Sequence, residues 1–210
     1  MTQLFIDIET RRTGNQKLVE RLMGSVKPPG SMSKPETIAK WWAENGAQAR
    51  LEAVNKTALD GTYGRLASFA WAVDDETVKC VRGEAESSVL YVAANVIAIA
   101  RDEQIVAFNG DFDLRFLLQR MIINGVPVPH AIRRALSERD GYYDPMREWA
   151  GFRGYIKQSE LAEAMGIAVD DETTGADIGT MIDAGDWAAV ERHNISDVET
   201  LRAIYKRMNA

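Results

Sequence analysis

The sequence predicts an α/β fold in which a mixed β-sheet lies between two layers of helices. Three β-rich runs, at 3–9, 65–73 and 77–83, precede the first long apolar helix pattern. From there on, a short apolar strand and segments with helical spacing alternate along the chain. Such alternation is typical of a sheet covered by helices on both faces, and 210 residues suit one domain with an ordinary core.

The first strand is followed by a long polar segment, which we interpret as a helical insertion at 11–64. Its first part is punctuated by Gly and Pro and contains one short helix pattern at 15–24. Ser33, Pro35 and Glu36 then form the pattern of a capping box with Ser33 as the N-cap, which predicts that a second helix begins there. We expect this helix to continue almost to the Gly-rich turn that ends the insertion.

The remaining elements are predicted by their hydrophobic periodicity. The strands at 65–73 and 77–83 are separated by Asp-Asp-Glu, which favours a hairpin. A further short apolar strand is expected at 104–108. Five segments place apolar residues at helical spacing, namely 87–102, 111–126, 129–136, 159–166 and 186–208.

Composition and charge narrow the classes of function. The net charge of −6 argues against a protein that coats DNA, although an enzyme that grips nucleic acid locally around metal ions is compatible with it. Cys80 is the only cysteine, which excludes an internal disulfide and a thiolate zinc cluster. No apolar run approaches the roughly 20 residues that span a bilayer, and the N-terminus lacks the pattern of a signal peptide. We therefore expect a cytoplasmic protein without membrane contact.

Acidic side chains recur at three separate places. Asp7 and Glu9 alternate with apolar residues in the first strand, so both project from one face of it. Asp113 lies one turn into an apolar helix face, whereas Asp111 reads as a helix cap. A third cluster, in ERHNISDVETL, places a histidine and an aspartate four residues apart on one helix face. Taken singly, each cluster also fits solvated surface carboxylates.

Taken together and in this order, the clusters resemble the motifs of the DEDD (DnaQ-like) superfamily of 3′–5′ exonucleases. FIDIET carries Asp7 and Glu9, FNGDFDLRFL carries Asp113, and HNISDVETL carries Asp197. Further segments, including YYDPMREWAG and SELAEAMGI, are similar to the group related to the exonuclease domain of family B DNA polymerases, which includes phage and prophage members. The resemblance covers nearly the whole chain. It implies an RNase H-like fold, a single exonuclease domain over 1–210, and a bacterial or phage-encoded protein.

The third motif departs from both subgroups of that superfamily. One subgroup has Tyr-x-x-x-Asp and the other has His-x-x-x-x-Asp, whereas this chain has His193-x-x-x-Asp197. The two spacings aim the side chain in different directions around the helix. Two interpretations of His193 therefore stay open, a group that contacts the attacking water and a passive neighbour.

The resemblance implies a catalytic site built on two divalent ions, Mg²⁺ or Mn²⁺. Asp7 would bridge both ions, and Glu9, Asp113 and Asp197 would complete the cluster, with His193 as general base or water-positioning group. Oxygen ligands of this kind suit both metals, and a metal pair can activate water and stabilise the leaving oxygen. Two cations would also explain why one buried strand carries two adjacent negative charges.

The expected activity is hydrolysis of single-stranded DNA from its 3′ end, releasing nucleoside monophosphates. Alternatives are a 3′–5′ exoribonuclease, a structure-specific endonuclease on a related fold, and a non-catalytic module that binds nucleic acid or a polymerase. Since no polymerase segment accompanies the motifs, a polymerase or replication protein would be a partner in trans.

Substrate contacts are predicted around the motifs. By analogy with the family, Thr10, Asn109 and Phe112 would contact the terminal nucleotide, although core packing is an equal interpretation of Phe112. Arg115 is a candidate for phosphate contact, and further candidates are Arg11, Arg12, Arg147, Arg153 and Lys157. His130 reads as structural or exposed. Trp41 and Trp42 are about 100° apart on one helix, so one of them is a candidate for a stacked base or a homo-oligomer interface, and a wide buried helix face is the alternative interpretation.

Overall fold

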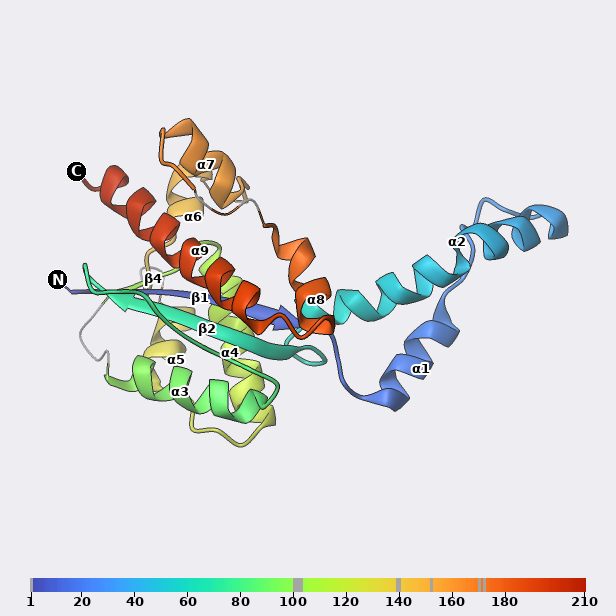
Figure 1. Ribbon diagram of the computed structural model, residues 1–210, viewed down its shortest axis with the longest axis horizontal. Coiled ribbons are helices and arrows are strands. Elements are labelled where there is room, and N and C mark those ends of the chain that lie inside the picture. The colour runs from blue at the N-terminus through green and yellow to red at the C-terminus, as the bar shows by residue number, and fades with distance from the viewer. Residues whose placement is uncertain (1, 100–103, 139–140, 152, 170, 172) are drawn as a thin grey trace.

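A computed structural model describes residues 2–99, 104–138, 141–151, 153–169, 171 and 173–210 of the chain (Figure 1). Its four-stranded sheet has the order β3-β2-β1-β4. The strands are β1 Gln3–Arg11, β2 Arg65–Val73, β3 Lys79–Arg82 and β4 Gln104–Val106. Because β1 is antiparallel to β2 and parallel to β4, the sheet is mixed, and the predicted fold class is confirmed.

Helices cover both faces of this sheet (Figure 1). One face carries α3 Glu86–Ile99, α4 Gly110–Ile123 and α5 His130–Ser137. The other face carries the long C-terminal helix α9, Trp187–Met208. Three shorter helices pack around α9, namely α6 Pro145–Ala150, α7 Gln158–Ala164 and α8 Gly175–Asp183.

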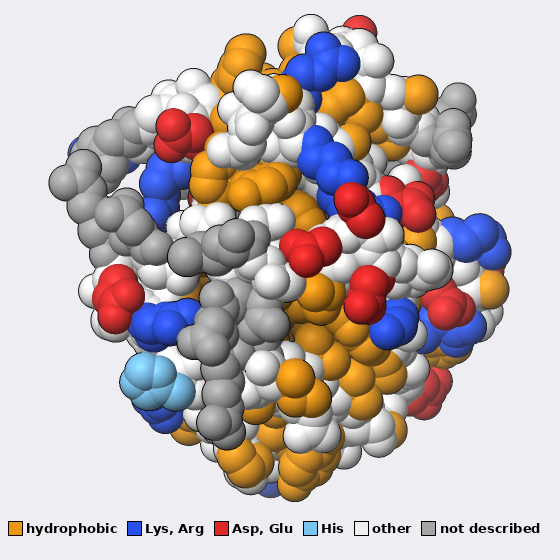
Figure 2. Space-filling view, turned by 90° about the vertical axis from the view of Figure 1, so that its left-hand side faces the viewer, with side chains coloured by type: hydrophobic (Ala, Val, Ile, Leu, Met, Phe, Trp, Pro, Cys, Tyr) orange, Lys and Arg blue, Asp and Glu red, His pale blue; other side chains and the backbone are white. Residues whose placement is uncertain are grey.

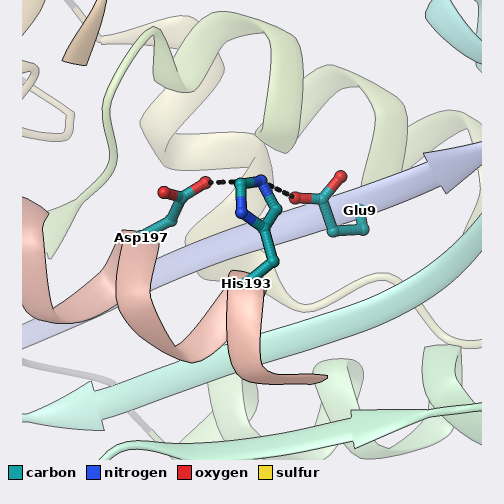
Figure 3. Close-up of side chains that lie close together, drawn as sticks. All are labelled: Glu9, His193 and Asp197. Atoms are coloured by element: carbon teal, nitrogen blue, oxygen red, sulfur yellow. Dashed lines mark ion pairs between the residues drawn. The ribbon is translucent and has the colours of Figure 1, made fainter. Parts of the chain in front are cut away.

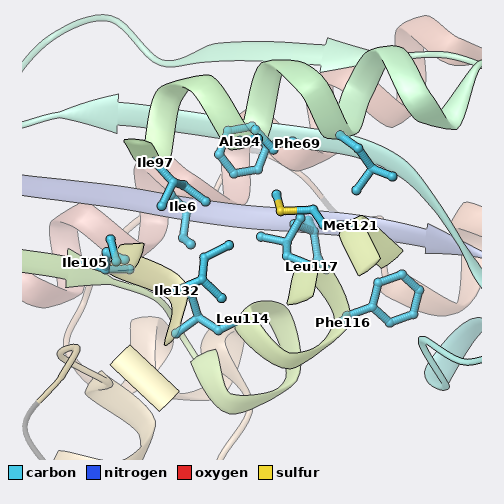
Figure 4. Packing of buried hydrophobic residues seen from close by; sticks show 14 of the residues in the cluster. Ile6, Phe69, Ala94, Ile97, Ile105, Leu114, Phe116, Leu117, Met121 and Ile132 are labelled. Carbon is cyan, nitrogen blue, oxygen red and sulfur yellow. The ribbon is translucent and has the colours of Figure 1, made fainter. Parts of the chain in front are cut away.

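The side chains of β1 alternate strictly between these two layers. Leu4, Ile6 and Ile8 are buried in the larger core, against α3, α4 and α5 (Figure 4). Phe5 is buried on the opposite side, in the cluster that includes Val198 of α9. The odd-numbered positions of β1 therefore face α9, and Asp7 and Glu9 follow Phe5 on that side.

The register of β1 and β2 shifts just beyond Glu9. Glu9 pairs with Ser68 but Thr10 pairs with Leu66, so one residue of β2 is left over and forms a bulge. Bulges of this kind bend a strand and redirect the side chains that follow. Here the bulge separates the acidic part of β1 from the point where the chain leaves the sheet.

The segment between β1 and β2 forms an arm that projects away from the sheet (Figure 1). It consists of α1 Gln16–Ser25, α2 Pro35–Asn55 and a short 3₁₀ helix η1, Lys56–Leu59. The expected helical insertion is thus present, but Ser33 does not cap α2. Lys34 holds the N-cap position without a side-chain hydrogen bond, because Pro35 is the first helical residue and the residue before a proline avoids helical geometry.

The start of α4 also differs from the expectation. The strand predicted at 104–108 ends at Val106, and Asn109 precedes α4 in the left-handed conformation, with φ 54°. Asp111 does not cap the helix. Instead its carboxylate accepts hydrogen bonds from the Arg115 guanidinium, the shorter of them 2.8 Å long, because both side chains lie on the exposed face of the first turns.

The short helices α6 and α8 were not anticipated, whereas the helices expected at 129–136, 159–166 and 186–208 are present with small changes at their ends. His130 is exposed at the first residue of α5, in agreement with the prediction. Among the described helices, none combines the length and the apolar character that crossing a bilayer requires.

Candidate active site

The predicted acidic residues from β1, α4 and α9 converge near the end of β1, on the side of the sheet that α9 covers. Glu9 projects from β1 toward α9, where His193 and Asp197 lie one turn apart (Figure 3). The Nε2 atom of His193 is 3.4 Å from Glu9 Oε1 and 3.4 Å from Asp197 Oδ2. One ligand atom from each of these three residues falls within 4.8 Å of the others. Segments almost 190 residues apart in the chain are therefore joined in one cluster.

Asp113 reaches this cluster from α4. Because Phe5 pairs with Val106 in a parallel register, β4 ends two residues before the level of Asp7, and the chain continues in that direction to the start of α4 at Gly110. Asp113 is only 4% exposed, and its carboxylate accepts hydrogen bonds from the backbone N–H groups of Asp113 itself and of Ile8. These bonds attach the side chain to β1 and fix its direction.

The four carboxylates strongly perturb one another. Burial, followed by repulsion from Asp113, Asp197 and Glu9, raises the pKa of Asp7 well above its usual range. Burial and then repulsion from Asp197 and Asp113 likewise raise the pKa of Glu9. For Asp113, burial raises the pKa to about 8, even though the two backbone hydrogen bonds act in the opposite direction. The pKa of Asp197 is also raised, mainly by burial.

No positive side chain relieves this repulsion in the described part of the chain. None of the Lys and Arg residues there forms an ion pair with any of the four carboxylates. Among the described residues, the basic side chain that contacts the cluster is the imidazole of His193. Desolvated oxygen donors that lack a counter-charge fit divalent cations of the Mg²⁺ and Mn²⁺ type, which prefer carboxylate ligands.

Asn194 is a member of the site that the sequence analysis missed. It is completely buried, and its Nδ2 donates a hydrogen bond of 2.5 Å to Asp7 Oδ2. Ser68 of β2 in turn donates to Asn194 Oδ1 at 2.7 Å. The chain Ser68–Asn194–Asp7 therefore fixes the orientation of the Asp7 carboxylate. An available signal was that Asn194 interrupts the apolar stripe formed by Val190 and Val198 on α9.

Asp171 is the second residue that was missed. Its Oδ2 lies 2.7 Å from His193 Nδ1, on the side of the ring opposite Glu9 and Asp197. Burial acts to raise the pKa of Asp171, but hydrogen bonds from Thr173 and then from His193 outweigh it and lower the pKa. Asp171 thus stays ionised and accepts the Nδ1 proton, which leaves Nε2 free to accept another. Asp171 lies in an irregular segment, so no periodicity pointed to it.

The predicted substrate-contacting residues lie next to the site acids in sequence, and they differ in their contacts within the protein. The Thr10 hydroxyl donates a hydrogen bond to Ala58 O at 2.7 Å, so its proton already has an acceptor in the short helix η1. Asn109 is exposed. Phe112 is half-buried and packs on Phe116, with ring centroids 5.7 Å apart. Arg115 is exposed and paired with Asp111.

The other phosphate-contact candidates already have protein partners. Arg11 donates to the carbonyl of Glu84, and Arg12 pairs with Asp183 at 3.0 Å. Arg147 donates to the Tyr142 hydroxyl at 2.8 Å. The ammonium of Lys157 lies 3.8 Å from Glu160, and Arg153 is exposed. No contact with phosphate is tested by these partners, so the assignments stay predictions.

Comparison with known proteins relates the chain by fold. No protein-family model matches it. No curated protein matches it by sequence either. Among solved structures, it is similar to the family B DNA polymerase from the hyperthermophilic archaeon Pyrobaculum calidifontis, with a TM-score of 0.52 and 13% sequence identity. The match covers 96% of this chain and 24% of that chain, so this chain spans about a quarter of the polymerase. The likeness agrees with an RNase H-like arrangement of the mixed sheet and its helices.

Proposed function

We propose that this protein is a metal-dependent 3′–5′ exonuclease that hydrolyses single-stranded DNA and releases nucleoside monophosphates. The observation that carries the proposal is the convergence of Asp7, Glu9, Asp113 and Asp197 into one desolvated site without a Lys or Arg partner among the described residues. A cluster of this kind is costly to fold unless cations occupy it. The resemblance to the DEDD motifs and the likeness in fold to a family B DNA polymerase support the same assignment.

In this proposal the four carboxylates hold two divalent ions. When bound, such ions supply an activated water and stabilise charge on the leaving oxygen of the phosphodiester. The protein holds the carboxylates in place before the ions arrive. Asn194 fixes Asp7 by a hydrogen bond, and the N–H of Ile8 fixes Asp113. This preorganisation limits the entropy that would otherwise be lost on forming the site.

His193 is the proton acceptor in this proposal. Its Nδ1 proton is held by Asp171, so Nε2 faces the cluster as an acceptor and can take a proton from the attacking water. The carboxylates of Glu9 and Asp197, each 3.4 Å from Nε2, then stabilise the imidazolium that forms. The spacing His-x-x-x-Asp places both side chains on the same side of α9, which supports an active role rather than a passive one.

The proposed substrate is the 3′ end of a single strand. Thr10, Asn109 and Phe112 lie next to the acids in sequence and are proposed to contact the terminal nucleotide, with Arg115 on a phosphate. A polymerase or replication protein in trans is the proposed biological partner. Selection between DNA and RNA depends on contacts to the 2′-hydroxyl.

The test is a time course with Mn²⁺ on single-stranded DNA and RNA labelled at either end. A 3′–5′ exonuclease shortens the 5′-labelled strand stepwise, and it releases the 3′ label as a mononucleotide at the earliest times. Asp7→Asn and EDTA should each abolish the reaction. Discrete internal products would instead indicate an endonuclease, and faster degradation of RNA would make the protein an exoribonuclease. Undiminished hydrolysis in EDTA would contradict the metal site.

A further inference from the structure

The arm, residues 12–59, is attached to the protein directly beside the candidate active site. Thr13 N–H donates to the Thr57 hydroxyl at 2.9 Å, which joins the two chain segments at the root of the arm. Thr10, one residue beyond Glu9, donates to Ala58 O. Arg12 contacts both Asn55 and Asp183, at 3.2 and 3.0 Å. The root is therefore held firmly at the end of β1.

Beyond this root the arm has almost no core of its own. The buried residues of its two main helices are Leu18, Gly46 and Val54. A helical pair that buries so little usually has a further role for its exposed surface, since most helical stability comes from packing. The arm points away from the sheet and its covering helices (Figure 1).

The arm also differs sharply in charge from the rest of the molecule. Residues 12–59 contain eight Lys and Arg and four Glu, a net charge of +4. Because the whole chain has a net charge of −6, the other residues together carry −10. On the end of the molecule opposite the arm, acidic and basic side chains are interspersed around an apolar area (Figure 2). Five exposed cations of the arm make no ion pair among the described residues, namely Lys17, Arg21, Lys27, Lys34 and Lys56.

One face of α2 carries a built aromatic and cationic surface. Trp42, Gly46 and Arg50 follow one another at intervals of four residues. The Trp42 ring lies over Gly46, where an added Cβ would come within 2.6 Å of Trp42 Cε3. The Arg50 guanidinium lies 5.0 Å from the centroid of the same ring. Glycine within a helix costs about 1 kcal/mol relative to alanine, and here it makes room for the indole.

We propose that the arm binds the single-stranded nucleic acid that leads away from the active site, with Trp42 and Arg50 as its stacking platform. Aromatic rings and guanidinium groups stack on bases of any sequence, and a positively charged surface attracts the phosphate backbone. Only the assignment of the strand's 3′ end to the carboxylates rests on the proposed nuclease function. Net positive charge and a flat indole favour a polyanion with exposed bases over an apolar protein partner.

The distance between Trp42 and the candidate active site sets the length of single strand that can contact both. Trp42 is 13 residues from Asn55 at the root of the arm, which corresponds to about 20 Å along the helix. A stacked single strand covers that distance with about six nucleotides. Short oligonucleotides therefore fill the active site without reaching Trp42, whereas longer ones contact both.

The experiment is fluorescence anisotropy with the full-length protein in EDTA, on oligo(dT) and oligo(U) of about 4 and about 16 nucleotides. The double variant Trp42→Ala/Arg50→Ala should weaken binding of the longer strand by about tenfold and leave binding of the shorter strand unchanged. The slope of log affinity against log salt should decrease by about 0.7 for each phosphate that the variant no longer binds. Gly46→Ala, which favours the helix but displaces the indole, should weaken binding of the longer strand without loss of folding.

The matched control is Trp149→Ala/Arg133→Ala, which removes an exposed tryptophan and an exposed arginine outside the arm. It should bind both strands as the parent does. Equal affinities of the parent and the Trp42/Arg50 variant for the longer strand would overturn the proposal, as would an equal loss in the control. A parent dimer that the Trp42/Arg50 variant converts to monomer, with nucleic-acid affinity unchanged, would assign the arm to contact between copies instead.

The two proposals can fail separately. If the protein binds the longer strand through the arm but does not hydrolyse it with Mn²⁺, the nuclease function is wrong and the arm inference stands. If it hydrolyses the strand while the arm variants bind like the parent, only the arm inference is wrong.

Discussion

Glu9 and Glu86 are both buried, 9% and 6% exposed, but they lie on opposite faces of the sheet in contrasting surroundings. Glu86, on the α3 side, accepts two hydrogen bonds of 2.8 Å from the Arg120 guanidinium and one of 2.7 Å from Leu66 N–H. Glu9, on the α9 side, faces the carboxylates of Asp197 and Asp113. One buried charge is neutralised by the protein, and the other is surrounded by charges of its own sign.

This contrast separates a structural charge from a functional one. A buried carboxylate with a bidentate arginine partner is complete, and it holds α3 and α4 together. Several buried carboxylates without an arginine or lysine raise the free energy of the folded protein, and such a cost persists where a ligand relieves it. The absence of a protein counter-charge in the described residues, rather than acidity itself, is what distinguishes the candidate active site.

The largest effect should come from Asp7→Asn, which leaves size and shape almost unchanged and removes one charge. Hydrolysis with Mn²⁺ should fall by about 10⁴-fold or more, equivalent to about 5.4 kcal/mol of transition-state stabilisation. Without metal, the variant should melt no lower than the parent, because the substitution relieves repulsion from three neighbouring acids. The measurements are single-turnover rates and thermal unfolding in EDTA. A substantially active variant would remove Asp7 from the mechanism.

Glu86→Gln should have the opposite effect, a loss of stability without a loss of activity. It leaves the Arg120 charge buried without its partner, and the free energy of unfolding should decrease by about 3–5 kcal/mol. Urea denaturation measures this loss, and the hydrolysis rate per folded molecule should be unchanged. The matched variant Glu86→Gln/Arg120→Met removes both charges and should recover part of the stability. If Glu86→Gln proved as stable as the parent, the ion pair of Glu86 with Arg120 would not stabilise the fold, and this part of the comparison would be wrong.

The fold and the four acids could be predicted from the sequence because both depend on local patterns. The alternation in LFIDIET places Asp7 and Glu9 on one face of a strand, and the helical spacing of the last segment places His193 next to Asp197. Their convergence was predicted by resemblance to a known motif order. Physical reasoning on each segment alone left all of them compatible with solvated carboxylates.

The residues that support the site could not be predicted in the same way. The role of Asn194 depends on its hydrogen bond to Asp7, which is 187 residues away in the chain. Within its own segment, Asn194 is only a polar residue in an apolar stripe. Asp171 acts from an irregular segment, where no period exists to read. The missed helix α6 is six residues long and too short for a periodic signal, although Asp144 and Pro145 form a recognisable cap. Side-chain partners of this kind are fixed by tertiary packing.

Asp171→Asn tests the orientation of His193 and should have a smaller effect than loss of a carboxylate from the cluster. The amide cannot hold the Nδ1 proton as the carboxylate does, so Nε2 is presented less often as an acceptor. Loss of such a supporting residue typically lowers activity by about 10–100-fold. The measurement is the hydrolysis rate at saturating Mn²⁺ and substrate, with Glu163→Gln, which neutralises an exposed carboxylate of α7, as the matched control. Equal rates for parent and Asp171→Asn would make the contact purely structural.

The smallest effect concerns the stability of the metal-free protein as pH changes. Because burial raises the pKa of Asp113 to about 8, the folded protein binds this proton more tightly than the unfolded chain does. The contribution of this bound proton to the free energy of unfolding is fully present below the ordinary aspartate pKa of about 3.9, and it is lost as the pH rises toward 8. The melting temperature in EDTA should therefore fall between about pH 5 and 8, and less steeply for Asp113→Asn. Mn²⁺ at about ten times its dissociation constant should restore about 1.4 kcal/mol at pH 8. If the melting temperature changed neither with pH nor on addition of Mn²⁺, the charges of the carboxylates on the α9 side would have to be neutralised within the protein, as that of Glu86 is by Arg120.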